Sequence, residues 1–518
     1  MPSYAPSRLD RAALVLVQLG AIAVVLAALP YKSFDLDRFL VPKELALHLV
    51  ATAAALLCLT TRQRLSVARV DWLLGGFLVL GAVSAVLAPN HWNAERALAI
   101  SWSSAVLFWV ARTLRRGGAG RALLWGLAIA GTLGAVTALA QAYGLRTEYF
   151  SLNRSPGGTF GNRNFMAHLG AIIAPTIVLC ALTARRTAGT LVAALLLAIV
   201  AASQVLSRSR AAWLALLAAG IPLAVAAWLT RERWAGRGTG RRLVVLMIAA
   251  GIGAVLALVL PNALEWKSDN PYLESVTGIV NYQEGSGHGR LVQYTNSLHM
   301  ALAHPVLGVG PGNWPVMYPR YASRGDPSLT SADEGMTSNP WPSSDWVAFI
   351  AERGLPATAL LALTLLALLA LAGWHARVGR GPDALLGAFA LAGTVIATVV
   401  VGALDAVLLI APPALFVWAL LGALVEPLPT SRKRAVARGV PQWAPVVVFA
   451  IGAVAIVRSA FQTAAMATYT GATRLSTLQR AALFDPGSYR IQLRLAQAEL
   501  DRGHCESARD RAHAARGL

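Results

Sequence analysis

Apolar segments alternate with short polar connections along almost the whole chain. They lie near residues 11–30, 43–60, 70–88, 97–113, 121–142, 164–183, 188–206, 211–230, 243–260, 347–373, 383–402, 404–424 and 441–460. Each is close to the roughly 20 residues that an α-helix needs to cross a bilayer, and none shows the two-residue alternation of barrel strands. The pattern predicts an all-α fold, a polytopic transmembrane helical bundle of about 12 to 13 spans.

Composition supports this class, and the positions of the basic residues predict an orientation. Apolar residues make up 56% of the 518 residues and charged residues only 14%, which excludes a soluble globular protein. Lys and Arg gather in every second connection and near the N-terminus: Arg8 and Arg11; Arg62, Arg64 and Arg69; Arg112, Arg115, Arg116 and Arg121; Arg185 and Arg186; Arg231, Arg233, Arg237, Arg241 and Arg242; Arg377 and Arg380; and Arg432, Lys433, Arg434 and Arg438. Basic residues of short loops stay on the cytoplasmic side. We therefore expect a cytoplasmic N-terminus and an external C-terminus. The net charge of +20 indicates contact with anionic lipid, not nucleic acid.

The remaining connections share the outer face, and the longest of them is the polar stretch 261–343. It contains Gly287-His288-Gly289-Arg290-Leu291 and the Gly- and Pro-rich run His304–Trp314. This stretch predicts an external cap over a functional site.

A turn between two predicted spans carries Arg208 and Arg210 within Ser207–Trp213. An arginine at the end of a span can simply extend its guanidinium to lipid headgroups. Two arginines in one turn that faces a large external loop favour diphosphate binding, because guanidinium is a planar, bidentate donor that stays charged.

These motifs together resemble the O-antigen ligase and O-antigen polymerase superfamily. The matching elements are Gly158–Asn164 (Gly-Thr-Phe-Gly-Asn-Arg-Asn), Ser207–Trp213, Gly289-Arg290 and His304–Asn313. Their order and spacing along the chain carry the resemblance, which covers roughly residues 10–425.

The resemblance implies a bacterial inner-membrane glycosyltransferase that works at the periplasmic face without a metal or other cofactor. Its donor would be a glycan linked to undecaprenyl diphosphate, and its acceptor lipid A-core or another glycan or protein. It implies diphosphate contacts at Arg210, Arg208, Arg290 and, more weakly, Lys43, with supporting roles for Asn162, Asn164, Glu352, Gly310 and Asn313. A polymerase or a protein O-oligosaccharyltransferase of the same superfamily stays open, because these enzymes share the donor site.

The sequence departs from the family at the expected general base. The family places a His-Asn pair nine residues before the Glu of a Glu-x-Gly-Leu motif, here Glu352, but Ser343 occupies that position. Asp345 or His304 could replace the histidine, as could His288 or His299. Asp345 could instead be an ordinary acid at a helix N-terminus, and His304 could shape a turn. The missing histidine also leaves a catalytically silent scaffold open.

Three regions are expected: residues 1–425 as the membrane domain with its loop 261–343, residues 426–460 as a basic linker and last span, and residues 461–518 as a periplasmic helical tail. Helical spacing in the tail resembles one tetratricopeptide-type pair, which would dock on the outer loop or on a protein partner. A transporter is less favoured, because such proteins carry ionisable residues in mid-membrane, whereas Asp405 is expected in a short turn.

Overall fold

A computed structural model describes residues 6–30, 37–61, 64–66, 68–151, 154–236, 238–266, 269–277, 285–323, 325–329, 337, 339–379, 381–425, 437–439, 441–469, 472, 474–516 and 518. The first part of the chain forms α1 (Arg8–Leu26), α2 (Asp37–Thr61), α3 (Arg69–Val86), α4 (His91–Leu114), η1 (Arg115–Ala119), α5 (Gly120–Ala142), η2 (Gly158–Phe160), α6 (Arg163–Leu182), α7 (Thr187–Ser207), α8 (Arg210–Leu229), α9 (Arg231–Trp234) and α10 (Thr239–Val259). The second part forms α11 (Pro271–Thr277), α12 (Gly285–Ala303), α13 (Trp314–Met317), η3 (Tyr318–Arg320), α14 (Asp345–Val378), α15 (Pro382–Leu404), α16 (Ala411–Leu424), α17 (Trp443–Tyr469), α18 (Leu475–Phe484), α19 (Tyr489–Leu500) and α20 (Cys505–Arg516). Two short strands, β1 (Arg64–Ser66) and β2 (Ala437–Gly439), pair antiparallel.

The chain is a multi-pass membrane protein. Within the described residues, 11 stretches are long and apolar enough to cross a bilayer. One of them, His91–Ala142, is two helices, α4 and α5, because the backbone leaves the helical conformation at Gly118, where φ is 83°. With these two helices separated and the shorter α16 included, the helices match the predicted apolar segments one to one. The predicted all-α polytopic bundle is confirmed.

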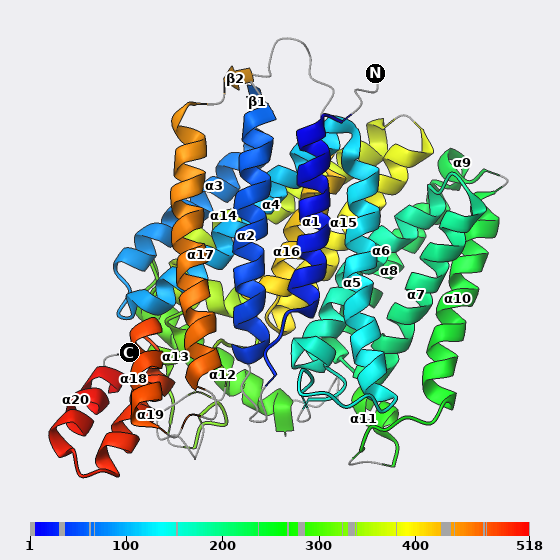
Figure 1. Cartoon of the computed structure of the whole chain (residues 1–518). Coiled ribbons are helices and arrows are strands. Elements are labelled where there is room, and N and C mark those ends of the chain that lie inside the picture. The colour runs from blue at the N-terminus through cyan, green and yellow to red at the C-terminus, as the bar shows by residue number, and fades with distance from the viewer. Residues whose placement is uncertain are drawn as a thin grey trace.

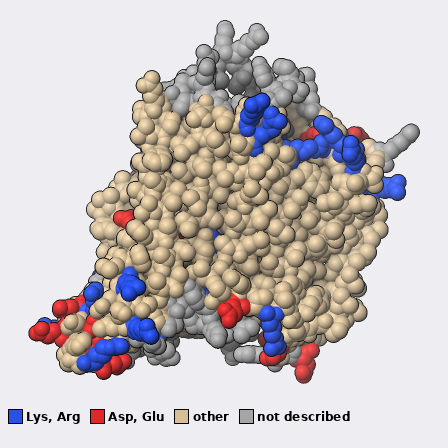
Figure 2. Space-filling view, in the orientation of Figure 1, with Lys and Arg blue, Asp and Glu red and all other residues tan. Residues whose placement is uncertain are grey.

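The spans run side by side, and the connecting elements lie at the two ends of the bundle (Figure 1). The start of α1 and the β1–β2 pair lie at the upper end, whereas α11, α12 and the tail helices α18 to α20 lie at the lower end. On the face in Figure 2, most Lys, Arg, Asp and Glu side chains gather toward these ends, with a broad and largely uncharged band between them. Of the predicted basic sites, Arg62, Arg237, Arg380, Arg432, Lys433 and Arg434 lie outside the described residues, as does most of the 426–442 linker.

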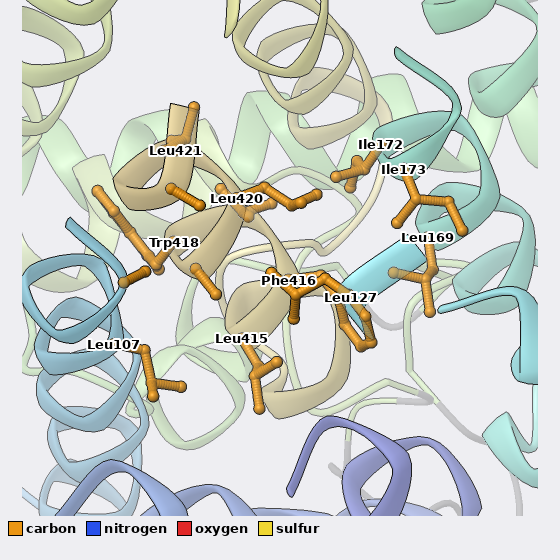
Figure 3. Close-up of a cluster of buried hydrophobic side chains, with 14 of the residues drawn as sticks. Leu107, Leu127, Leu169, Ile172, Ile173, Leu415, Phe416, Trp418, Leu420 and Leu421 are labelled. Carbon is orange, nitrogen blue, oxygen red and sulfur yellow. The ribbon is translucent and has the colours of Figure 1, made fainter. Parts of the chain in front are cut away.

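The short helix α16 lies at the centre of the bundle. All 14 of its residues are buried, and Leu415, Phe416 and Leu420 lie among side chains of α4, α5 and α6, including Leu127 and Leu169 (Figure 3). At 1.5 Å per residue, a helix of this length spans about 21 Å, less than the hydrocarbon core of a bilayer. Because α16 is short, the turn between α15 and α16 lies inside the protein, and Asp405 in that turn is only 9% exposed.

The tail packs against the membrane bundle. A small apolar core that includes Leu478, Ile491 and Leu495 joins α18 and α19 to the end of α17. The indole Nε1 of Trp92, at the start of α4, donates a hydrogen bond to Asp485 at 2.5 Å, and the Arg458 guanidinium lies 4.5 Å from the centre of the Trp92 ring. The tail therefore docks on the lower end of α4. Its tetratricopeptide-like character stays a prediction.

Candidate functional site

A cavity of about 1000 Å³ lies at the lower end of the bundle, among α5, α6, α12 and the connections that join them. Its polar lining combines basic, acidic and amide side chains: Arg146, Arg154, Arg163, Arg208 and Arg290; Glu265, Glu274 and Asp405; Gln141, Asn162, Asn164, Gln293 and Asn339. Four aromatic side chains complete the wall: Phe150, Phe165, Trp266 and Trp341. Five arginines against three carboxylates give the cavity an excess of positive charge, which favours an anionic ligand.

Arg208 is held in the turn between α7 and α8 by an unusual backbone conformation. Its φ is 52°, in the left-handed region, and its guanidinium donates to the Pro271 carbonyl at 2.9 Å and lies 4.3 Å from the centre of the Trp266 ring. Burial lowers the pKa of Arg208, and the nearby Glu274 carboxylate acts in the opposite direction. The guanidinium nevertheless stays charged near neutral pH, so it presents a fixed cation to the cavity.

The second basic group comes from the start of α6. Asn162 caps this helix, and its side chain accepts a hydrogen bond from the Asn164 N–H at 3.0 Å. Arg163 lies between the two predicted asparagines and lines the cavity. Its positive charge is repelled by those of the nearby Arg208, Arg154 and Arg210. Arg163 is part of the Gly158–Asn164 motif, although the resemblance to the family implies no role for it. A helix N-terminus and a cation that face the same space together favour a bound anion.

The other predicted arginines occupy different places. Arg290, on α12, lines the cavity beside Gln293. Arg210 begins α8 outside the lining, although it is close enough to Arg163 and Arg208 to interact with both. Arg208 and Arg290, which are far apart in the sequence, therefore meet at one cavity.

Asp405 is one of the three carboxylates that line the cavity. Its Oδ2 lies 3.4 Å from the Asn164 amide nitrogen and 3.9 Å from Nε2 of the buried His168. The same imidazole nitrogen lies 3.4 Å from the Ser209 hydroxyl. Asp405 lies in a turn, as its sequence context predicts, but no motif in the sequence indicates a role for it. Its partners come from α6, so no local sequence signal could have joined them.

Ser343 lines the cavity at the position where the family histidine is expected. Its N–H donates to the Gln293 side chain at 2.7 Å, and its carbonyl accepts from the Tyr294 hydroxyl at 2.5 Å. The segment that would carry the histidine thus does face the cavity.

The two residues predicted as bases lie outside the cavity lining. Asp345 is fully buried, and its carboxylate accepts hydrogen bonds from the backbone N–H groups of Val407 and Leu408. His304 is exposed, and its backbone carbonyl accepts from Gly308 N–H in the turn that follows α12. His288 and His299 are exposed on α12 and do not line the cavity either. These contacts favour structural roles for Asp345 and His304.

Lys43 supports a motif and does not line the cavity. Its fully buried ammonium group donates to the carbonyls of Val25 and Ala27 at 2.8 and 2.6 Å, at the end of α1. The same group lies 5.3 Å from the centre of the Phe160 ring in the Gly158–Asn164 motif. Lys43 therefore joins α1 and α2 to the segment that leads into α6.

The three remaining supporting residues hold the His304–Asn313 segment against the bundle. The Glu352 carboxylate accepts from the N–H groups of Gly312 at 2.8 Å and Trp314 at 3.1 Å, and its backbone carbonyl accepts from Gly310 N–H at 2.8 Å. The Asn313 side chain exchanges two hydrogen bonds with the backbone of Asn90, at 2.8 and 3.0 Å. These contacts fix the segment to α14 and to the α3–α4 turn.

Comparison with known proteins gives one family. The family model described as O-Antigen ligase matches residues 192–362, which run from α7 into α14 and include Arg208, Arg290 and Ser343. No curated protein matches the chain. Among the described residues, no group of three His, Cys, Asp or Glu side chains is placed to hold a metal ion.

Proposed function

Since residues 192–362 make this chain a member of the O-antigen ligase superfamily, we propose that it transfers a glycan from undecaprenyl diphosphate to an acceptor hydroxyl at the periplasmic face of the bacterial inner membrane. The observation that carries the proposal is that Arg208 and Arg290, from two separate family motifs, line one cavity with the Asp405 carboxylate. A lipid-linked glycan transferase needs cations that bind the donor diphosphate and a base that takes the acceptor proton, both in the same cavity.

The arginines hold the donor diphosphate. Arg208 and Arg290 act as the predicted contacts, and Arg163 adds a third cation at the N-terminus of α6. Guanidinium groups bind phosphate oxygens with two parallel hydrogen bonds. They also stabilise the charge that develops on the leaving diphosphate, which speeds the reaction if that contact strengthens in the transition state.

Asp405 acts as the general base in place of the absent histidine. It accepts the proton of the acceptor hydroxyl while that oxygen forms a bond to the anomeric carbon of the donor sugar. The bond from the anomeric carbon to the phosphate oxygen breaks, and its electron pair leaves with undecaprenyl diphosphate. The proton passes from Asp405 to water before the next turnover. Asn164 and His168, at 3.4 and 3.9 Å from Oδ2, orient the carboxylate.

Transfer should be measured with the purified full chain in proteoliposomes that contain an undecaprenyl-diphosphate-linked glycan. Arg208→Ala and Arg290→Ala should each lower the rate about tenfold to a hundredfold, because a hydrogen bond to a charged group contributes about 1.5–3 kcal/mol. Arg233→Ala is the matched control, since Arg233 lies on α9 and donates to the carbonyls of Ala376 and Gly379, away from the cavity.

Wild-type rates in both cavity variants would contradict the site. Glycan profiles of cells that lack the gene then separate the acceptors. Loss of long glycan from lipid A-core, with polymer retained on the carrier, indicates a ligase. Attached single repeats without long chains indicate a polymerase, and an unchanged profile indicates another acceptor or a silent scaffold.

A further inference from the structure

We propose that Trp341 is the determinant of acceptor binding, because one sugar ring of a glycan acceptor stacks on its indole. The inference rests on the proposed function, because it identifies the acceptor side of the same cavity. Trp341 is partly buried, lines the cavity and packs against Phe165, with ring centres 6.1 Å apart.

The backbone around Trp341 is stiffened by proline on both sides. The sequence Asn339-Pro340-Trp341-Pro342-Ser343 places a proline after Asn339 and another after Trp341. A residue that precedes proline is restricted to extended backbone conformations. Asn339, Trp341 and Ser343 all line the cavity, whereas the two prolines do not. The prolines therefore restrict the backbone that carries Trp341, and the polar residues Asn339 and Ser343 line the cavity on either side of it.

Trp341 is connected to the proposed base through a short series of contacts. Phe165 packs against Trp341 and also lies 6.4 Å, centre to centre, from the His168 ring. His168 in turn lies 3.9 Å from Asp405. Trp341 and Asp405 line the same cavity, so a sugar ring on Trp341 occupies the space that the Asp405 carboxylate also faces.

The lining near Trp341 matches a sugar in its chemistry. A pyranose has an apolar C–H face, which packs on an aromatic ring, and a rim of hydroxyl groups, which need hydrogen-bond partners. Asn339, Gln293 and Ser328 also line the cavity. The Gln293 amide donates to the Ser328 hydroxyl at 3.2 Å and accepts from the Ser343 N–H at 2.7 Å, so these groups form a polar, hydrogen-bonded part of the lining. The other cavity tryptophan, Trp266, already has the Arg208 guanidinium 4.3 Å from its ring centre. Trp341 is thus the better platform.

A peptide acceptor is less well matched. Extended peptides are commonly bound through backbone hydrogen bonds to the edge of a strand. None of the described residues that line this cavity belongs to a β-strand. The aromatic platform favours a ring in place of a serine or threonine on an extended chain.

The test uses the full chain in nanodiscs with the lipid-linked donor at saturation. The acceptor probes are a soluble core oligosaccharide of lipopolysaccharide, an oligosaccharide released from the donor, and a serine-containing peptide. Trp341→Ala should raise the KM for a glycan acceptor about tenfold, while kcat and the KM for the donor stay near wild type. Trp341→Phe should restore most of the affinity. Trp228→Ala is the control, because Trp228 is 64% exposed on α8 and does not line the cavity.

An unchanged KM in Trp341→Ala, or transfer to the peptide alone, overturns the proposal. If the wild-type chain transfers to no probe, binding of the two oligosaccharides is measured by isothermal titration calorimetry, which does not depend on the Trp341 fluorophore. Binding that is lost in Trp341→Ala and kept in Trp228→Ala supports the sugar site and counts against the transfer function. Failure of both oligosaccharides to bind the wild-type chain overturns the sugar site.

Discussion

Asp345 and Leu408 are joined across the bundle by a hydrogen bond of 2.8 Å, in which the Leu408 N–H donates to the carboxylate Oδ2 of Asp345. The Val407 N–H donates to both carboxylate oxygens, at 3.0 and 3.1 Å. Val407 and Leu408 belong to the turn that carries Asp405 and leads into α16, whereas Asp345 begins α14. A buried backbone N–H without an acceptor is costly, so Asp345 stabilises the turn that forms one wall of the cavity.

We expect Asp345→Asn to destabilise the protein. The asparagine amide group keeps one acceptor oxygen but turns a donor toward at least one backbone N–H, and hydrogen bonds to a charged group contribute about 1.5–3 kcal/mol each. Thermal unfolding of the purified variant should show a lower midpoint than wild type. Asp383→Asn, on the exposed first turn of α15, should leave the midpoint unchanged. A variant as stable as wild type that has lost transfer would restore Asp345 as the catalytic base.

Asp405→Asn should lower the transfer rate and leave the stability of the protein unchanged. Removal of a general base lowers kcat by about 10²- to 10⁴-fold, whereas the turn keeps the backbone contacts that Asp345 provides. We expect a normal unfolding midpoint together with this loss of kcat at saturating donor and acceptor. His168→Ala should lower kcat less, because His168 only orients the carboxylate from 3.9 Å. Full activity in Asp405→Asn would exclude this residue as the base.

Gly354 should not tolerate a side chain. Its φ of 79° and ψ of 171° interrupt α14, in a region that is essentially limited to glycine. A Cβ there would contact the Val306 carbonyl in the His304–Asn313 segment. Gly354→Ala should therefore cost about 1–3 kcal/mol of backbone strain in addition to this clash, and the yield of folded protein should fall. Gly373→Ala is the control in the same helix, since a Cβ there meets nothing within 4 Å.

The fold could be predicted from the sequence because lipid permits few backbone structures. Apolar runs in a bilayer must satisfy their own hydrogen bonds, so each run gives a helix. Even the short α16 appeared as an apolar segment, although its position at the centre of the bundle depends on contacts with α4, α5 and α6.

The candidate site could be predicted only in part, because motifs are local and the cavity is not. Arg208, Arg290, Asn162 and Asn164 belong to recognisable motifs, and all four line the cavity. Asp405 meets Asn164 across 241 positions of sequence, so it looked like a residue of an ordinary turn. His304 belongs to a conspicuous motif but does not line the cavity, so its role as a base stays a prediction.

The orientation of the chain can be tested with its own cysteines. Cys505 is exposed on α20, whereas Cys58 and Cys180 are buried at 6% and 3% exposure. In spheroplasts with an intact inner membrane, a membrane-impermeant maleimide should label the wild-type chain and not Cys505→Ser. Gly238→Cys introduced into Cys505→Ser should be labelled only after the membrane is permeabilised, because Gly238 is exposed at the opposite end, near α9. The cavity and α20 lie at the same end of the bundle. Labelling of Cys505 only after permeabilisation would place the cavity in the cytoplasm, out of reach of a donor in the outer leaflet, and would overturn the proposed reaction together with the orientation.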